Sequence, residues 1–268
     1  MSGSGQRAAS PVRGDGWVVL GGTDTVLVTE DEPVRFVHIG LSPPERGVPV
    51  LVGDNGRRRT WAVATSSDVP PAPGTRFVPA WELVSRLGPE EFAVLSRARM
   101  LATWQRDHRF CGRCGSPTAA APDEHATVCS VCGLRSYPRI SPVIIVRVTR
   151  GDEILLARPR RAGRALYSVL AGFVEAGESL EETVVREIAE EVGIAVTGIA
   201  YFGSQPWPFP HALMVGFTAR WIGGEITPDP GEIVDAGWYR RGVLPEIPPH
   251  GSIARALIDD FLAAATTA

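Results

Sequence analysis

Residues 172–194 read GFVEAGESLEETVVREIAEEVGI, a glutamate-rich stretch that contains one arginine and no lysine. Ser179 and, three residues later, Glu182 form a capping-box signature, so we expect a helix to begin near Leu180. Gly193 supplies the stop signal at its other end. An apolar residue recurs at every fourth position between these limits and predicts one buried face, made of Leu180, Val184, Ile188 and Val192.

Three carboxylates lie beside that face, because Glu187, Glu190 and Glu191 occupy positions i, i+3 and i+4 of the predicted helix. Unpaired, these like charges would repel one another and weaken the helix. A solvated helix face is the alternative interpretation, but it predicts lysines among the glutamates. Hard cations such as Mg²⁺ or Mn²⁺ take oxygen ligands and would turn the repulsion into binding. The pattern favours a divalent-metal site, with Arg186 and Glu178 placed to form a supporting ion pair.

The composition indicates a globular protein. The chain has 268 residues, 44% of them hydrophobic, which is enough for two ordinary domains with separate cores. No apolar run approaches the ~20 residues that a membrane span needs, and the first residues lack the apolar core of a signal peptide. We therefore expect a soluble, cytoplasmic protein without membrane contact. The net charge of −3 argues against a protein built mainly to neutralise a nucleic-acid backbone.

Two closely spaced cysteine pairs predict a zinc site. The pairs lie in CGRCG and CSVCG with fourteen residues between Cys114 and Cys129, and a glycine after each second cysteine permits the left-handed backbone that such a knuckle requires. Two disulfides or four reduced core cysteines are the alternatives. Four sulfur ligands leave no open position for water, so this zinc would be structural rather than catalytic. The predicted ligands are Cys111, Cys114, Cys129 and Cys132.

The chain divides into four predicted parts. Residues 1–16 are small and polar and predict a disordered tail. Residues 17–105 contain short apolar runs between turn residues and predict a β-rich domain that ends in a connector helix, whose pattern covers 89–107. The zinc ribbon follows at 106–138. Residues 139–268 mix strands with helices at 180–192 and from about 252 to 265, which is typical of an α+β or α/β sandwich.

The glutamate-rich stretch resembles the complete Nudix box. Gly172 is followed after five residues by Glu178 and, after seven more, by REIAEEVGI from Arg186 to Ile194. Members of that family hydrolyse a nucleoside diphosphate linked to another group. The resemblance implies a Nudix α/β/α sandwich for residues 139–268. It also implies that Glu178 pairs with Arg186 and that the catalytic ions are held by Glu187, Glu190 and Glu191, together with the carbonyl of Ala171.

Downstream, SQPWPFP at residues 204–210 predicts a stiff, non-helical loop, either a structural corner or a ligand-facing segment. A Nudix box with this loop and a four-cysteine ribbon is similar to the NADH pyrophosphatase subfamily. Where that subfamily usually has glutamine and serine after the loop, this chain has His211 and Ala212, so a hydroxyl is lost. By matching position, Glu232 is a further metal-side glutamate. The expected substrate contacts are Glu124, Tyr137, Phe173, Gln205, Pro206, Trp207, Pro208, Phe209, Pro210, His211, Ala212 and Ala254.

The basic run ARPRRAGR contains Arg158, Arg160, Arg161 and Arg164. We interpret it as a solvated loop, the alternative being an approach to phosphate or to an RNA chain.

The hypothesis is metal-dependent hydrolysis of NADH, and of NAD⁺, at the central pyrophosphate, giving AMP and nicotinamide mononucleotide. Two or more Mg²⁺ or Mn²⁺ ions would bind per site, with one structural Zn²⁺. Within the same chemistry, the substrate could be an NAD cap on an RNA 5′ end. From a different class, the chain could be a zinc-ribbon nucleic-acid-binding regulator whose hydrolase domain is only a sensor. The family resemblance also implies a homodimer.

Overall fold

The computed structural model describes residues 10–12, 14–22, 24–31, 33–39, 48–65, 70–160 and 166–264. The chain forms two compact units. The first contains the residues up to Arg139 together with Pro208–His211, and the second contains Ile140–Trp207 and the residues from Ala212 onward. No helix in the described ranges is both long enough and apolar enough to cross a bilayer.

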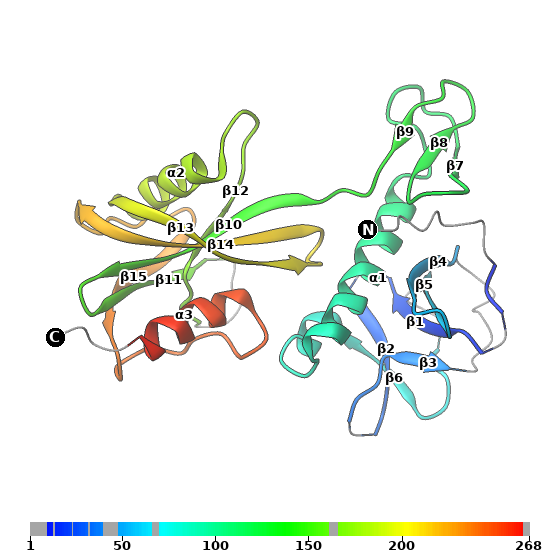
Figure 1. Ribbon diagram of the computed structural model, residues 1–268, viewed down its shortest axis with the longest axis horizontal. Coiled ribbons are helices and arrows are strands. Elements are labelled where there is room, and N and C mark those ends of the chain that lie inside the picture. The colour runs from blue at the N-terminus through cyan, green and yellow to red at the C-terminus, as the bar shows by residue number, and fades with distance from the viewer. Residues whose placement is uncertain are drawn as a thin grey trace. The chain divides into compact units, whose positions relative to one another are not determined.

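A mixed sheet forms the centre of the second unit (Figure 1). Its strand order is β13-β14-β10-β11-β15, and β12 pairs with β10. The central strand β10 runs parallel to β14 from Ser141 to Thr149 and antiparallel to β12. The strands are β10 (Ser141–Arg150), β11 (Glu153–Pro159), β12 (Leu170–Phe173), β13 (Ala195–Trp207), β14 (Ala212–Gly223) and β15 (Ile233–Arg240).

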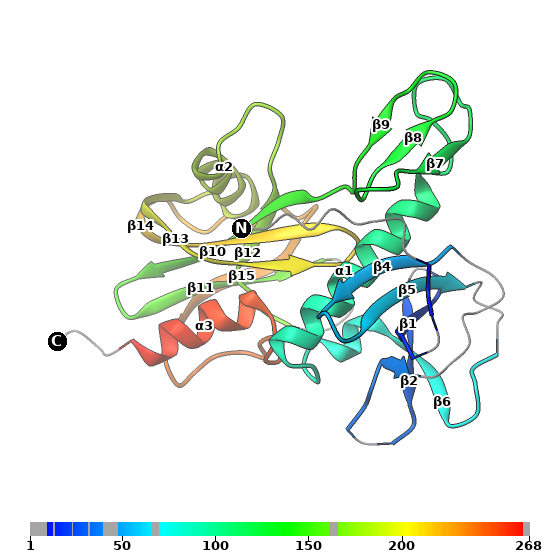
Figure 2. The ribbon, with the colours of Figure 1, turned by 45° about the vertical axis from the view of Figure 1, so that its right-hand side comes forward.

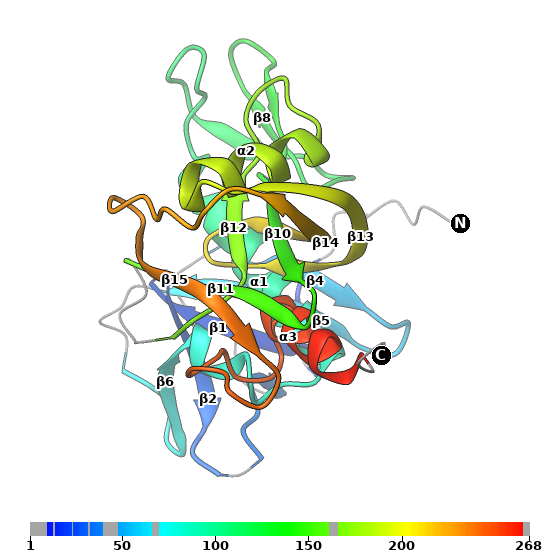
Figure 3. The same ribbon diagram turned by 90° about the vertical axis from the view of Figure 1, so that its left-hand side faces the viewer.

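Two helices cover opposite faces of this sheet, α2 (Leu180–Val192) and α3 (Ile253–Ala263), as Figures 1 and 3 show. Alternation along β10 explains both cores, because successive side chains of a strand point to opposite faces. Ile144 and Val146 pack on the α2 side, whereas Val143 and Ile145 pack on the α3 side. The second unit is thus the α/β/α sandwich that the sequence predicted.

The first unit contains a separate sheet, of order β4-β5-β1-β2-β6 with β3 paired to β1. The long helix α1 (Pro89–Asp107) lies along one face of it (Figure 2) and contributes Leu95, Ala98 and Leu101 to the core. A short 3₁₀ helix precedes α1 at Ala80–Leu83. The strands are β1 (Gly16–Gly21), β2 (Thr25–Thr29), β3 (Val37–Ile39), β4 (Val50–Asp54), β5 (Arg59–Thr65) and β6 (Thr75–Pro79).

A small three-stranded sheet of order β7-β8-β9 follows α1 and carries the cysteines. Its strands are β7 (Thr118–Ala120), β8 (Thr127–Cys129) and β9 (Arg135–Ser136).

Three helices were expected from the sequence. The connector helix is confirmed over its whole length, and α2 is confirmed at both ends. The last helix ends at Ala263, short of the expected 265.

Two expectations need correction. The expected loop at 204–210 is mostly strand, because Ser204 to Trp207 pair with β14 and only the residues after Trp207 form the turn. β13 is an edge strand, where a proline that lacks an N–H group can be accommodated, so Pro206 does not break the ladder. The expected disordered tail lies mainly outside the described residues, but Asp15 is buried and accepts a 2.7 Å hydrogen bond from the Trp61 indole.

Replacing Ile188 with alanine is expected to reduce the free energy of unfolding by about 2–5 kcal/mol, because the side chain is fully buried between α2 and the sheet. Val185 lies on the outer side of the same helix and is 47% exposed, so Val185→Ala should change it by less than about 0.5 kcal/mol. Urea unfolding followed by circular dichroism measures both. Equal losses would contradict the assigned orientation of α2.

Candidate metal centres

Both ends of α2 are defined by local hydrogen bonds. At the start, the Ser179 hydroxyl accepts from the Glu182 N–H (3.3 Å), and the Glu182 carboxylate accepts from the Ser179 N–H (2.8 Å). At the end, Gly193 takes the left-handed conformation with φ of 73°. These contacts fix where the helix begins and ends, and hence where its acidic side chains project.

The glycine at position 172 leaves space for an acid. Gly172 lies in β12, paired with Ile144 of β10, and the Glu187 carboxylate of α2 lies directly over it. A Cβ atom at this position would overlap that carboxylate group. Glycine therefore matters here because a larger residue would displace the Glu187 carboxylate, not because of backbone conformation.

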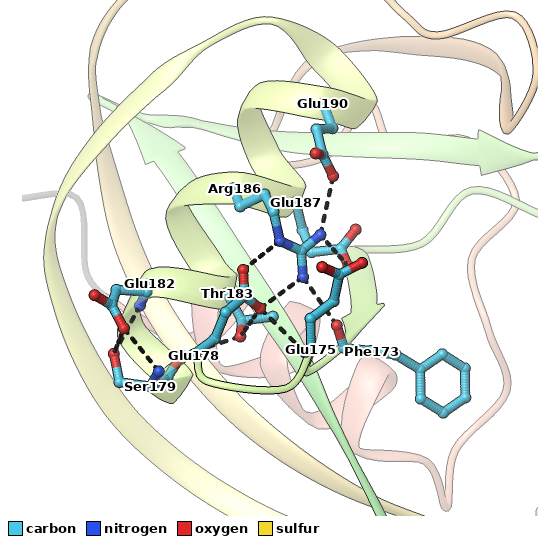
Figure 4. A network of polar contacts seen from close by, with 9 residues as sticks. All are labelled: Phe173, Glu175, Glu178, Ser179, Glu182, Thr183, Arg186, Glu187 and Glu190. Carbon is cyan, nitrogen blue, oxygen red and sulfur yellow. Dashed lines mark hydrogen bonds and ion pairs between the residues drawn. The ribbon is translucent and has the colours of Figure 1, made fainter.

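Arg186 connects the acids of α2 to the preceding loop (Figure 4). Its guanidinium donates to both carboxylate oxygens of Glu178, at 2.5 and 2.9 Å, in the planar two-point geometry that arginine favours. Its remaining N–H groups reach the Phe173 carbonyl at 3.0 Å and the carboxylates of Glu187 and Glu190 at 2.9 Å each. One cation thus offsets much of the repulsion among three carboxylates.

Glu178 receives two further hydrogen bonds. The buried Thr183 hydroxyl donates at 2.8 Å, and the Glu175 N–H donates at 3.1 Å. Arg186 and these donors lower the pKa of Glu178 to about 2, so this residue stays ionised and anchors the loop. Sequence reasoning missed Thr183, because a hydroxyl on the buried side of a helix has no distinctive spacing.

A cavity of about 300 Å³ opens beside α2 and is lined by Glu191, Glu232 and Ala171, among others. Glu191 is only 7% exposed, and its Oε2 atom has no hydrogen-bond partner among the described residues. Burial, together with the charges of Glu187, Glu232 and Glu190, raises the pKa of Glu191 to about 8. A buried carboxylate without a partner is costly, and a divalent cation in the cavity would supply one.

Glu187 and Glu190, the other two acids of the box, are oriented differently from Glu191. Burial also raises the pKa of Glu187, although Arg186 opposes the shift. Glu190 turns toward Arg186, with its side chain 60% exposed. Within the described ranges, the four cysteine sulfurs form a close set of ligand atoms, and the glutamate oxygens form no set as close as this. The site thus brings Glu191, Glu232 and Ala171 to one cavity, with Glu187 over the adjacent strand.

The four cysteines meet in two equivalent knuckles. Their ligand atoms all lie within 4.8 Å of one another, and none is in a disulfide. In each knuckle the glycine after the second cysteine has positive φ, 73° at Gly115 and 71° at Gly133. Backbone N–H groups of Arg113 and Val131 point to the first sulfur of each knuckle, both at 3.4 Å. This set fits a tetrahedral structural zinc.

The expected substrate contacts are divided between the two units. In the first, Glu124 accepts from Arg135 and from the Tyr137 hydroxyl, and Tyr137 is 55% exposed. Pro208 is buried there, its carbonyl accepts from Arg99 at 3.2 Å, and the Arg99 guanidinium lies over the Phe209 ring. Pro210 is exposed, whereas His211 lines a small cavity that includes His108 and Arg139.

In the second unit the Phe173 ring is 57% exposed and extends away from the polar network (Figure 4). Gln205 is fully engaged, because its amide donates to the Gly251 carbonyl and accepts from the Ile253 N–H, both at 2.8 Å. It thereby holds the start of α3. Pro206 is exposed, Trp207 and Ala254 are half-buried, and Ala212 is buried.

The interpretation of the basic run as a solvated loop is wrong at Arg158, which lies in a strand, whereas Arg160 is an exposed turn residue. Arg158 lies within β11 with its guanidinium over the Tyr167 ring, and Arg160 donates to the Pro230 carbonyl. Arg158 belongs to strand β11, which pairs with β15. The local sequence could not show this pairing, because β15 lies far away along the chain. Arg161 and Arg164 lie outside the described residues.

Two family models match the chain. The NUDIX domain model matches residues 138–261, and the NADH pyrophosphatase zinc ribbon domain model matches residues 106–137. Together these matches cover the cysteine cluster, the sheet of the second unit, α2 and α3 up to Phe261.

Similar proteins agree with the family models. The NAD-capped RNA hydrolase NudC of Stutzerimonas stutzeri is 50% identical over 197 residues, which cover 73% of this chain and 71% of that protein. The enzyme of the same name from Pseudomonas aeruginosa is 50% identical over 191 residues, 71% of this chain and 69% of that one. A NUDIX hydrolase structure from Nitrosomonas europaea superimposes with a TM-score of 0.51 at 19% identity, covering 57% of this chain and 90% of that chain. That likeness concerns the fold alone.

Gly172→Ala is expected to leave the protein folded but to weaken Mn²⁺ binding at least about tenfold, because the new methyl group displaces Glu187. Gly203→Ala is the matched control, since a Cβ atom there meets no other group. Electron paramagnetic resonance titration measures free Mn²⁺. Wild-type affinity in a folded Gly172→Ala variant would show that Glu187 is not needed for the ion.

Cys114→Ser should bind much less zinc than the parent chain, which is expected to hold about one equivalent, because three sulfurs close the site poorly. Ser130→Ala is a control on the same ribbon, since that hydroxyl only donates to the Pro117 carbonyl. Elemental analysis of purified protein gives the zinc content. Undiminished zinc in Cys114→Ser would rule out the four-sulfur site.

Proposed function

This chain belongs to the Nudix hydrolases, and from that premise we propose that it cleaves the central pyrophosphate of NAD in a metal-dependent reaction, both in free NADH or NAD⁺ and in the NAD cap of an RNA. Free dinucleotide gives AMP and nicotinamide mononucleotide. Capped RNA gives the mononucleotide and an RNA with a 5′ monophosphate. The observation that carries the proposal is the buried Glu191 carboxylate, whose Oε2 atom finds no hydrogen-bond partner among the described residues, in a cavity beside the box helix.

The donor set fits Mg²⁺ or Mn²⁺ better than a softer ion. The residues that line the cavity are mainly apolar, and its two acids, Glu191 and Glu232, offer carboxylate oxygens, which are hard ligands. We assign Glu187, Glu190, Glu191, Glu232 and the Ala171 carbonyl as the residues that hold these ions. When bound, the ions would neutralise phosphate charge and lower the pKa of a water molecule that attacks phosphorus.

The protein's own groups prepare the site. Arg186 contacts both Glu178 and the Phe173 carbonyl at the end of β12, and these contacts tie the loop before α2 to the helix. Glu191, kept largely from solvent at the cavity, is one of the carboxylates that would orient an attacking water or accept its proton once a bound cation keeps it ionised. No side chain needs to form a covalent bond to substrate.

Substrate selection is assigned to groups outside the box. The exposed Phe173 ring adjoins the metal ligands in sequence and offers a flat face to a nicotinamide or adenine ring. Gln205 holds the turn that leads into α3 and so places Ala254. Glu124, Tyr137 and residues 206–212 complete the proposed set. An open adenosine 3′ side would admit RNA as well as the free dinucleotide.

The zinc is assigned a structural role, since four sulfurs surround it. We further propose that the chain forms a homodimer, as the family resemblance implies, which light scattering after gel filtration tests. The proposed substrates are intracellular molecules, so the expected compartment is the cytoplasm.

Glu191→Gln is expected to reduce turnover of NADH at least about a hundredfold while the protein stays folded, because the amide removes both the charge and the proton acceptor. Glu181→Gln, on an exposed position of the same helix, should keep nearly full activity. Mass spectrometry of products from NADH and from NAD-capped RNA, with Mg²⁺ or Mn²⁺, measures both. A fully active Glu191→Gln enzyme would contradict the metal assignment.

A further inference from the structure

The segment before Glu232 is tied to the end of α2 by main-chain hydrogen bonds. The Thr227 N–H donates to the Val192 carbonyl and the Asp229 N–H donates to the Glu191 carbonyl, both at 2.9 Å. The last carbonyls of a helix lack partners within the helix, so these two contacts satisfy groups that would otherwise need water. The segment is thereby aligned with Glu191, one of the acids that lines the cavity.

From Asp229 the chain makes a tight turn that ends on Glu232. The N–H groups of Glu232 and Ile233 donate to the Asp229 carbonyl at 3.1 and 2.8 Å. The Asp229 side chain accepts from the Gly231 N–H at 2.8 Å. The turn is therefore closed on one side by its own atoms.

Arg160 closes the other side. Its guanidinium donates from Nε and Nη2 to the Pro230 carbonyl, at 2.9 and 2.6 Å, and its main-chain N–H donates to the Glu232 carbonyl at 2.7 Å. Arg160 directly follows β11, whose pairing with β15 slips in register at Pro159. The ladder is irregular at that point, so the arginine supplies contacts to the turn that regular pairing does not.

We propose that Arg160 is a positioning residue for the metal site, acting through Glu232, whose carboxylate it holds at the cavity by fixing the 229–232 turn. The inference rests on the proposed function, which assigns Glu232 as a metal ligand. Two N–H groups of the Arg160 guanidinium donate to the single Pro230 carbonyl oxygen, which defines the direction as well as the distance of the contact. A lysine cannot reproduce this geometry. Within the described ranges its hydrogen bonds go to main-chain atoms, so its effect on the ion would be indirect.

A purely structural role for Arg160 is the competing explanation. The two explanations differ in whether the effect of Arg160 on metal binding depends on Glu232. If Arg160 only stabilised the edge of the sheet, its loss would lower the melting temperature and act independently of Glu232. If it positions Glu232, its effect on metal binding must vanish once that carboxylate is gone.

The test uses the full chain with bound zinc, without nucleotide, and follows Mn²⁺ by electron paramagnetic resonance titration. The variants are Arg160→Ala, Arg160→Lys, Glu232→Gln and the double variant Arg160→Ala/Glu232→Gln. Arg240→Ala is the matched control, because Arg240 is a 70% exposed arginine of β15 whose contact is the Glu153 carboxylate. Melting temperatures are recorded without added Mn²⁺.

Arg160→Ala is expected to weaken one Mn²⁺ site about tenfold, a typical effect of removing an outer-shell partner of a ligand. Arg160→Lys should lose less Mn²⁺ affinity than Arg160→Ala, and Arg240→Ala should bind Mn²⁺ as tightly as the parent chain. The double variant should bind no more weakly than Glu232→Gln alone. Should Arg160→Ala unfold, Arg160→Lys against Glu232→Gln provides the same comparison.

Three results would overturn the inference. Parent-like Mn²⁺ affinity in Arg160→Ala, together with weaker Mn²⁺ binding in Glu232→Gln, would show that Arg160 does not position Glu232. The proposed function would be unaffected. An additive loss in the double variant shows that Arg160 acts without Glu232. Parent-like affinity in Glu232→Gln refutes that residue as a ligand, and this failure belongs to the proposed function, from which the inference follows.

Discussion

The architecture around the box depends on one arginine that offsets several carboxylates. Without Arg186, the acids of α2 and of the preceding loop would repel each other next to a buried helix face. Its fork instead connects Glu178, the Phe173 carbonyl and two acids of the helix. The loop, strand β12 and helix α2 thus become a single rigid frame. Beside that frame Glu191 is buried, and its Oε2 atom has no hydrogen-bond partner in the described part of the chain, a cost that a bound cation would offset.

Two local features of the sheet lie beside the acids. Gly172 lets the Glu187 carboxylate lie against β12, and the pairing of β11 with β15 slips at Pro159, one residue before Arg160 contacts the turn that carries Glu232. The second feature interrupts the regular ladder. Irregular pairing is common next to functional sites because it redirects side chains that a regular ladder would hold on the wrong face.

The two metal centres have different physical characters. In the ribbon, two repeated knuckles with left-handed glycines bring four sulfurs together over a short stretch of chain. The arrangement is local, closed to water and suited to stabilising a part of the chain too small for its own apolar core. The glutamate site draws on a helix, a strand and a distant turn. It is open on one side, as a site that must admit substrate has to be.

Local signals in the sequence determined the limits of α2, its buried face, the zinc ligands and the pairing of Glu178 with Arg186. Each of these depends on residues fewer than about 25 positions apart, where helical periodicity or knuckle geometry leaves little choice. Tertiary structure alone decided that Ser204–Trp207 form an edge strand, that Thr183 supports Glu178 and that Gln205 holds α3. It also decided that Arg160 contacts Glu232, 72 residues further along the chain. Such contacts follow from strand order and register, and no local pattern encodes which distant segment will lie alongside.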